Sequence, residues 1–109
     1  MARIIGQWGV NAFVAMSRFR VRPGQEQMTN DAFRARPHRV DAHPGFIRME
    51  VLSPQDQSNE YWLMTFWEDR ESFEQWHHHH LNESHAFMPR GLKVERDSRI
   101  LQYFDLVTE

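Results

Sequence analysis

Histidine is the residue type in this sequence that points most directly to chemistry. The 109 residues include seven histidines and no cysteine, and residues 77–80 are four histidines in a row. An imidazole can ligate a metal ion or exchange a proton near neutral pH. Consecutive residues of a helix point about 100° apart, however, so only His77 and His80 share a face, and a helical run cannot converge on one ion. We interpret the run as solvated histidines that bind metal only adventitiously.

A single histidine near a tryptophan is the stronger candidate. Trp76 lies on the apolar stripe of an expected helix, and His85 follows nine residues later, after the polar segment 82–84. One interpretation is a core tryptophan and an ordinary loop histidine. The other is a cleft between helix and sheet, with the indole along its wall and the imidazole aimed into it. Such a cleft would suit a flat, apolar, iron-bearing ligand.

The elements that hold these residues follow from hydrophobic spacing and from Pro-Gly breaks. The first helix is expected to end or kink at Pro37, with Val40 continuing its apolar stripe if the chain turns again. The second helix carries apolar residues three and four apart, and Asp69 or Ser72 can cap it. Residues 88–98 are typical of a loop. Strands are expected over residues 13–21, 46–52, 60–67 and 99–107, and helices over residues 25–36 and 71–82.

The order strand, helix, strand, strand, helix, strand is that of the α+β ferredoxin-like arrangement, an antiparallel sheet with both helices on one face. The expected strands are apolar on both sides. Within residues 60–67, Leu63 and Trp67 point to one face of the sheet, and Trp62 and Phe66 point to the other. The helices can cover only one face. We therefore predict a two-fold homodimer in which a second copy of the chain covers the opposite face.

Composition excludes several classes of protein. At 109 residues the chain is expected to form one domain, residues 12–109, preceded by a loose extension, residues 1–11. The absence of cysteine excludes disulfides, iron-sulfur clusters, thiolate zinc sites and a cysteine nucleophile. Thirteen basic against fifteen acidic residues give a net charge of -2, which argues against nucleic acid as a partner. The extension is too short and polar for a membrane span or a signal-peptide core, so we expect a cytoplasmic protein.

Three segments of the sequence resemble a known family. They are Phe66 to Trp76, FWEDRESFEQW, with His85 beyond it; residues 19–26, FRVRPGQE; and Pro44-Gly45-Phe46. The pattern resembles the antibiotic-biosynthesis monooxygenase superfamily (ABM) and, within it, the IsdG-type haem-degrading monooxygenases. The resemblance covers residues 13–107, and the interval between the tryptophan and the histidine is its most specific part.

The resemblance implies a ferredoxin-like fold that dimerises into an α+β barrel, and a reaction that degrades haem. It makes His85 the proximal ligand of the haem iron, and Trp76 the residue that presses on the macrocycle and helps to distort it, which favours oxidation at a meso carbon. Haem is then substrate and cofactor at once. Molecular oxygen and an external electron donor, such as a reductase, are the other reactants that the resemblance implies.

Two further positions follow from the resemblance. Family members carry an asparagine on the first strand whose amide contacts the distal ligand, and the matching residue here is Ser17. Its shorter hydroxyl either acts on such a ligand through a water molecule or bonds to the local backbone. Arg36, with Arg34, either meets the haem propionates or faces water, as most surface arginines do.

The sequence leaves three functions open. The first is a haem-degrading monooxygenase that oxidatively opens the macrocycle and releases iron. The second is a cofactor-independent monooxygenase of the same superfamily, whose cleft binds a small-molecule substrate, a polycyclic phenol or quinol, directly. The third is a non-catalytic haem-binding protein, which is consistent with the missing asparagine.

Overall fold

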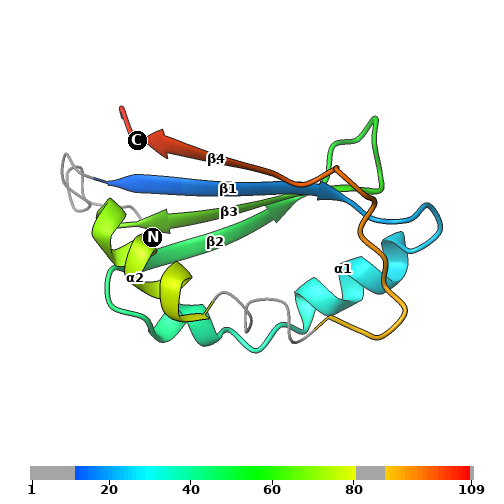
Figure 1. Ribbon diagram of the computed structural model, residues 1–109, viewed down its shortest axis with the longest axis horizontal. Helices are drawn as coiled ribbons and strands as arrows, with labels where there is room; N and C mark the ends of the chain where they lie inside the picture. The colour runs from blue at the N-terminus through cyan, green and yellow to red at the C-terminus, as the bar shows by residue number, and fades with distance from the viewer. Residues whose placement is uncertain (1–11, 81–87, 109) are drawn as a thin grey trace.

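The computed structural model describes residues 12–80 and 88–108. In this part of the chain, four strands form one antiparallel sheet in the order β2-β3-β1-β4 (Figure 1). This order, with two helices on one face, confirms the predicted ferredoxin-like α+β fold. No helix of the described residues is long and apolar enough to cross a membrane. The elements are β1 (Phe13–Arg20), α1 (Glu26–Arg34), the short 3-10 helix η1 (Arg39–Ala42), β2 (Phe46–Leu52), β3 (Glu60–Trp67), α2 (Arg70–His80) and β4 (Ile100–Asp105).

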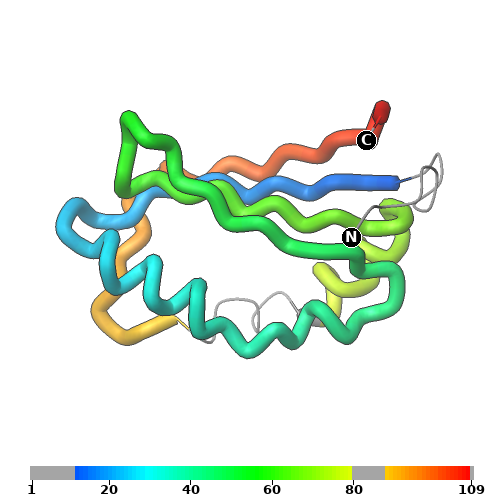
Figure 2. Tube along the Cα trace, turned by 180° about the vertical axis from the view of Figure 1, so that it is seen from behind, coloured from blue at the N-terminus to red at the C-terminus, as the bar shows by residue number. Residues whose placement is uncertain are grey.

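The register of the sheet determines which side chains face the helices. On β1, Ser17 lies opposite Leu63 of β3, and Ala15 lies opposite Tyr103 of β4. Directly paired residues point to the same face, and residues two apart on a strand do so as well. All four side chains therefore share one face of the sheet. Figures 1 and 2 show α1 and α2 on the same side of the sheet, below the strands in both views.

The segment after α1 continues beneath the sheet toward α2 (Figure 2). The helix stops at Arg34, two residues before the expected end, because Pro37 disfavours helical geometry at the residue before it. His38 then adopts a left-handed conformation with φ of 57°. The chain resumes as η1, which buries Val40 as the apolar spacing predicts. This turn brings the residues between α1 and β2 beneath the sheet.

A side-chain cap starts α2. The Asp69 carboxylate accepts hydrogen bonds from the backbone N–H and the hydroxyl of Ser72, both at 2.8 Å. These bonds lower the pKa of the Asp69 carboxyl, because they stabilise its charged form. The helix begins at Arg70, one residue before its expected start, and Phe73 and Trp76 pack toward the sheet. Its expected end lies outside the described residues.

Trp67 is the centre of the core beneath α2. Its side chain is fully buried, and its indole N–H donates a hydrogen bond to the Thr65 hydroxyl at 2.8 Å. The ring centroids of Phe46, Phe73 and Trp76 lie 5.4 to 5.8 Å from that of Trp67. A second buried cluster packs α1 against the other end of the sheet and consists of Phe19, Val21, Phe33 and Tyr61.

The sheet face without helices leaves apolar side chains exposed, and so does β4. Every residue of β4 is exposed in the single chain. On the open face, Leu52, Ile100 and Phe104 have 48%, 41% and 38% of their surface accessible. Leu52 lies opposite Trp62, so the apolar residues of neighbouring strands adjoin one another. The predicted homodimer would cover this surface, and it stays a prediction.

The turn at Gly45 gives the first testable prediction. Gly45 has a φ of +84°, and a Cβ there would overlap the side chain of Ser72. Left-handed strain and overpacking should together lower the free energy of unfolding of Gly45→Ala by about 2–4 kcal/mol, measured in urea. Gly24→Ala is the matched control, because Gly24 has a φ of +96° but open space around it. It should cost only about 1–2 kcal/mol, and equal losses in the two variants would contradict the contact with Ser72.

Candidate functional site

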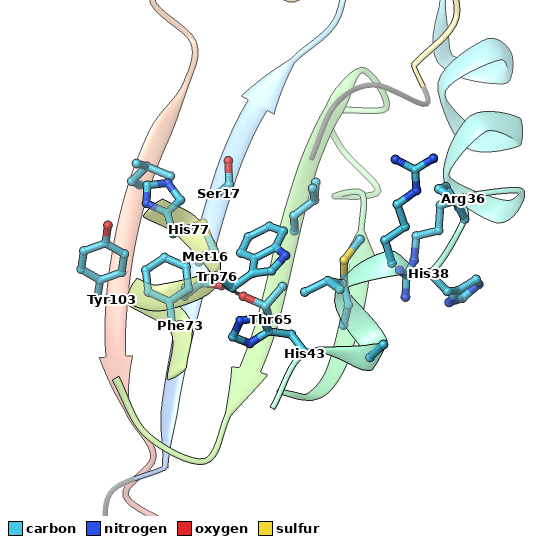
Figure 3. A pocket seen from close by; sticks show the side chains of 18 of the residues that line it. Met16, Ser17, Arg36, His38, His43, Thr65, Phe73, Trp76, His77 and Tyr103 are labelled. Carbon is cyan, nitrogen blue, oxygen red and sulfur yellow. Dashed lines mark hydrogen bonds between the residues drawn. The ribbon is translucent and has the colours of Figure 1, made fainter. Parts of the chain in front are cut away.

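A cavity of about 540 Å³ lies beneath the helix-covered face of the sheet, between α2 and residues 36–44 (Figure 3). Side chains from all four strands line it, together with residues of α2 and of the turn after α1. This volume is in the range of pockets that bind small molecules and cofactors. The cavity is therefore the candidate site, and its chemistry depends on the three kinds of side chain around it.

An apolar and aromatic wall forms the middle of the cavity. Phe73 and Trp76 line it from α2, and Met49 and Leu63 line it from the sheet. Trp76 is half-buried, and its ring centroid lies 5.8 Å from that of Trp67 in the core. Because Trp67 is fully buried, it supports the Trp76 indole from behind. A flat apolar ring is the kind of ligand that such a wall binds best.

The turn after α1 gives the cavity a basic side. Arg36, His38 and Arg39 line it there. Asp41 holds two of these residues: its carboxylate oxygens lie 3.1 Å from Arg36 Nη1 and 3.2 Å from His38 Nδ1. The Arg36 side chain is only 12% exposed. Asp41 compensates one of the two arginine charges, and no aspartate or glutamate is among the described lining residues. The remaining positive charge of this side favours an anionic group.

The side of the cavity next to β4 carries three uncharged polar side chains together with Arg99, which lines the cavity directly before β4. Ser17, His77 and Tyr103 line it, and Figure 3 shows the three on the same side of Trp76. The rings of His77 and Tyr103 lie 5.2 and 5.5 Å from that of Phe73. None of the three side chains makes a hydrogen bond to another described residue. The Ser17 hydroxyl thus has no local backbone partner there and is available to a ligand.

The structure brings most of the expected site residues together. Trp76, Ser17 and Arg36 all line the same cavity. Arg34 does not, since its side chain is 74% exposed and its guanidinium lies 3.9 Å from the carboxylate of Asp31. His85, the fourth expected site residue, lies outside the described residues.

Three histidines to which the sequence assigns little weight also line the cavity: His38, His43 and His77. His77 follows Phe73 by four residues on one helical face, so the sequence contained a signal for it. His38 and His43 lie in the segment between α1 and β2, where no regular spacing of apolar residues predicts which side chains face inward. His43 lies edge-on to Trp67 at 5.9 Å. Among the described residues, no three histidines or carboxylates are grouped to hold a metal ion.

The protein is a ferredoxin-like α+β domain with a ligand-sized cavity between its helices and its sheet. The chain belongs to the antibiotic biosynthesis monooxygenase family, whose model matches residues 12–88. A curated relative, the mycobilin-producing heme oxygenase of Mycobacterium tuberculosis, is 36% identical over 44 residues. That match covers 40% of this chain and 42% of the relative, less than half the length of either.

Solved structures resemble the chain over most of its length. MhuD, a heme-degrader from Mycobacterium tuberculosis with two hemes bound in its active site, superposes with a TM-score of 0.74 and 25% identity, over 89% of this chain and 97% of that one. SnoaB, a cofactor-independent oxygenase from Streptomyces nogalater, superposes with a TM-score of 0.69 and 21% identity, over 91% and 96% of the two chains. The likeness to SnoaB shows the fold alone.

The basic side of the cavity predicts selective loss of anion binding in Arg36→Gln. Anilinonaphthalene sulfonate, a fluorescent aromatic anion, should bind the wild type with its rings on the aromatic wall. In Arg36→Gln its dissociation constant should rise about 3- to 10-fold, because a charged hydrogen-bond donor in a half-enclosed site is removed. Arg34→Gln is the control, since Arg34 points to solvent on the same segment. An equal rise in both variants would show that only net charge matters.

Proposed function

We propose that this protein is a haem-degrading monooxygenase, which oxidatively opens the haem macrocycle and releases its iron. The observation that carries the proposal is the cavity, where an aromatic wall of Phe73 and Trp76 adjoins a basic side at Arg36. Haem is flat and apolar with carboxylates at one edge, so the macrocycle fits the wall and a propionate fits Arg36. Membership of the monooxygenase family and the likeness to the heme-degrader MhuD support it.

Each expected site residue has a role in this proposal. Trp76, backed by Trp67, would contact the macrocycle and help to distort it. Arg36 pairs with a propionate, and Ser17 donates a hydrogen bond on the sheet side of the ligand, directly or through a water molecule. His85 would hold the haem iron through an imidazole nitrogen. Its role rests on the resemblance of the sequence, because it lies outside the described residues.

The reactants other than haem follow from the reaction class. Haem when bound supplies the iron that activates oxygen and is also the substrate, and opening its macrocycle requires molecular oxygen and electrons from an external donor. We infer a reductase as that donor. The described residues bind the ligand, orient it and hold it against Trp76. The cytoplasmic location expected from the sequence stays a prediction.

A cofactor-independent monooxygenase is the second candidate function. Its substrate would be a polycyclic phenol or quinol that binds to the aromatic wall directly, and His85 would hold no iron. The aromatic wall supports it, because a polycyclic substrate can bind there without iron. The serine at position 17, where an asparagine is expected, instead favours the third candidate. A non-catalytic haem-binding protein is the third candidate, and it differs from the first only in turnover.

Titration with hemin tests the proposal. The purified protein should form a saturable one-to-one complex with a Soret band, and His85→Ala should lose it because the iron then lacks its axial imidazole. His79→Ala, an exposed position of α2, should keep the complex. With ascorbate or a reductase in air, the Soret band of the wild-type complex should decay and a chelator assay should detect released iron.

Each other outcome of this titration selects a different function. No complex in the wild type would exclude both haem functions and leave the cofactor-independent monooxygenase. A complex whose Soret band persists for hours with the reductant would mean a non-catalytic haem-binding protein. Equal loss of the complex in His79→Ala and His85→Ala would remove the assignment of His85 as the ligand.

We further infer that the functional unit is a homodimer. The open face of the sheet carries Leu52 and Trp62, which lie opposite each other on β2 and β3, and Ile100 and Phe104 on β4, with β1 between the two pairs. Leu52, Ile100 and Phe104 are exposed in the single chain. Exposed apolar side chains that gather in one patch commonly mark an interface between proteins. A second copy of the chain presents the same apolar residues, so pairing of two copies through this face would remove the patch from water.

Light scattering during size-exclusion chromatography tests the dimer. The wild type should have twice the mass of the chain at micromolar concentration, and Ile100→Glu should shift it toward the monomer by placing a charge in the apolar interface. Val107→Glu is the control, because Val107 is 93% exposed beyond the end of β4. A wild-type monomer, or a dimer unaffected by Ile100→Glu, would refute the proposed interface.

A further inference from the structure

We propose that His77 is a ligand-contacting residue that determines specificity, and that Ser17, His77 and Tyr103 together form a polar wall for the oxygen-bearing edge of an aromatic ligand. The proposal rests on the proposed function in taking the cavity as the ligand site. It adds a residue, His77, that the resemblance does not assign, and a chemical group, an aromatic hydroxyl or carbonyl oxygen. It also gives the ligand an orientation in the cavity.

The aromatic packing of α2 places His77 at the cavity. His77 lies one helical turn beyond Phe73, and the two rings stack with centroids 5.2 Å apart and planes 18° apart. Phe73 is buried and lies 5.5 Å from Tyr103, centroid to centroid. Phe73 therefore packs against both of the other rings and links them to the core. The imidazole and the phenol both line the cavity.

The strand register adds Ser17 to the same wall. Tyr103 of β4 lies opposite Ala15 of β1, and Ser17 is two residues further along β1 on the same face. Ser17 and Tyr103 are thus diagonal neighbours, with Cα atoms about 7–8 Å apart. A ligand edge that contacts one of the two side chains is within reach of the other.

The three polar side chains have unused hydrogen-bonding capacity. None of them bonds to another described residue, although Ser17 and His77 are partly buried and all three lie next to apolar groups. A few convergent polar groups on an otherwise apolar surface are what orient a ligand in a pocket. Each group can donate a hydrogen bond, and a neutral imidazole can accept one as well.

The two polar sides of the cavity select different groups. Arg36, with Arg39 nearby, favours an anion, whereas Ser17, His77 and Tyr103 are uncharged and favour a neutral oxygen. Arg99 also lines the cavity, two residues before Leu101, the register partner of Ser17. Figure 3 shows Arg36 and His38 on one side of Trp76, and His77 with Tyr103 on the other. An aromatic ligand with an acidic edge and a hydroxyl or carbonyl edge fits the cavity with its rings on Trp76, its acid at Arg36 and its oxygen at the polar wall.

A pair of probes without iron or carboxylate tests the polar wall. Equilibrium dialysis measures the dissociation constants of α-naphthol and of naphthalene, which differ by one hydroxyl. Without a hydrogen bond, the more apolar naphthalene should bind at least as tightly as the naphthol. We expect the wild type to bind α-naphthol about 5- to 10-fold more tightly than naphthalene, which corresponds to one or two hydrogen bonds.

Variants of α2 assign this preference to His77. In His77→Ala the preference for the naphthol should fall to about twofold or less, while the affinity for naphthalene reports any change in the apolar wall. His77→Gln, which keeps a donor, should retain part of the preference. His78→Ala is the matched control, because His78 is the exposed next residue on the same helix and should keep the wild-type preference.

The outcomes separate this proposal from the haem function. The proposed polar wall would be refuted by any of three results. The wild type binds the two probes equally, it binds neither probe, or His77→Ala keeps the wild-type preference for the naphthol. The probes contain no iron, so these results do not depend on the hemin titration. A protein that prefers the naphthol through His77 and binds no hemin would retain the polar wall and lose the haem-degrading function.

Discussion

The fully buried indole of Trp67 is the interaction on which the rest of the site depends. It lies at the end of β3, and its contacts reach β2 through Phe46 and α2 through Phe73 and Trp76. Its N–H group is satisfied by Thr65 at 2.8 Å, so no polar group is left unpaired there. Interiors are packed too tightly for such rings to shift independently. The aromatic wall is therefore in place before a ligand arrives, which lowers the entropic cost of binding.

The cavity combines this rigid wall with polar groups of two kinds from different parts of the fold. The basic side comes from the turn after α1, where Asp41 pairs with Arg36 and His38. The second polar side comes from β1, α2 and β4. A ligand that is flat and apolar in the middle and polar at both edges satisfies all three surfaces. A polycyclic quinol with an acidic group meets this description, whereas haem has its carboxylates at one edge and satisfies the aromatic wall and one polar side, which is why binding experiments with and without iron are the informative ones.

Local sequence patterns account for most of the fold. Alternation along the strands predicts the two faces of the sheet, and the spacing of Phe73 and Trp76 predicts the inner side of α2, because both follow from backbone geometry alone. The position at which α1 ends does not follow from hydrophobic spacing. Pro37 marks the break, but the helix stops at Arg34, and the left-handed conformation of His38 that redirects the chain has no counterpart in hydrophobic spacing.

Local patterns predict the element order and the apolar faces, and the resemblance to a family adds the candidates Trp76, Ser17 and Arg36. That these three side chains surround one cavity, and that His77 and Tyr103 share it, follows only from the folded arrangement. These residues lie on separate elements, so no local periodicity relates them. Their meeting depends on the register of β1 with β4 and on the docking of α2 against Trp67. Both are set by long-range pairing and close packing, which act only once the chain is folded.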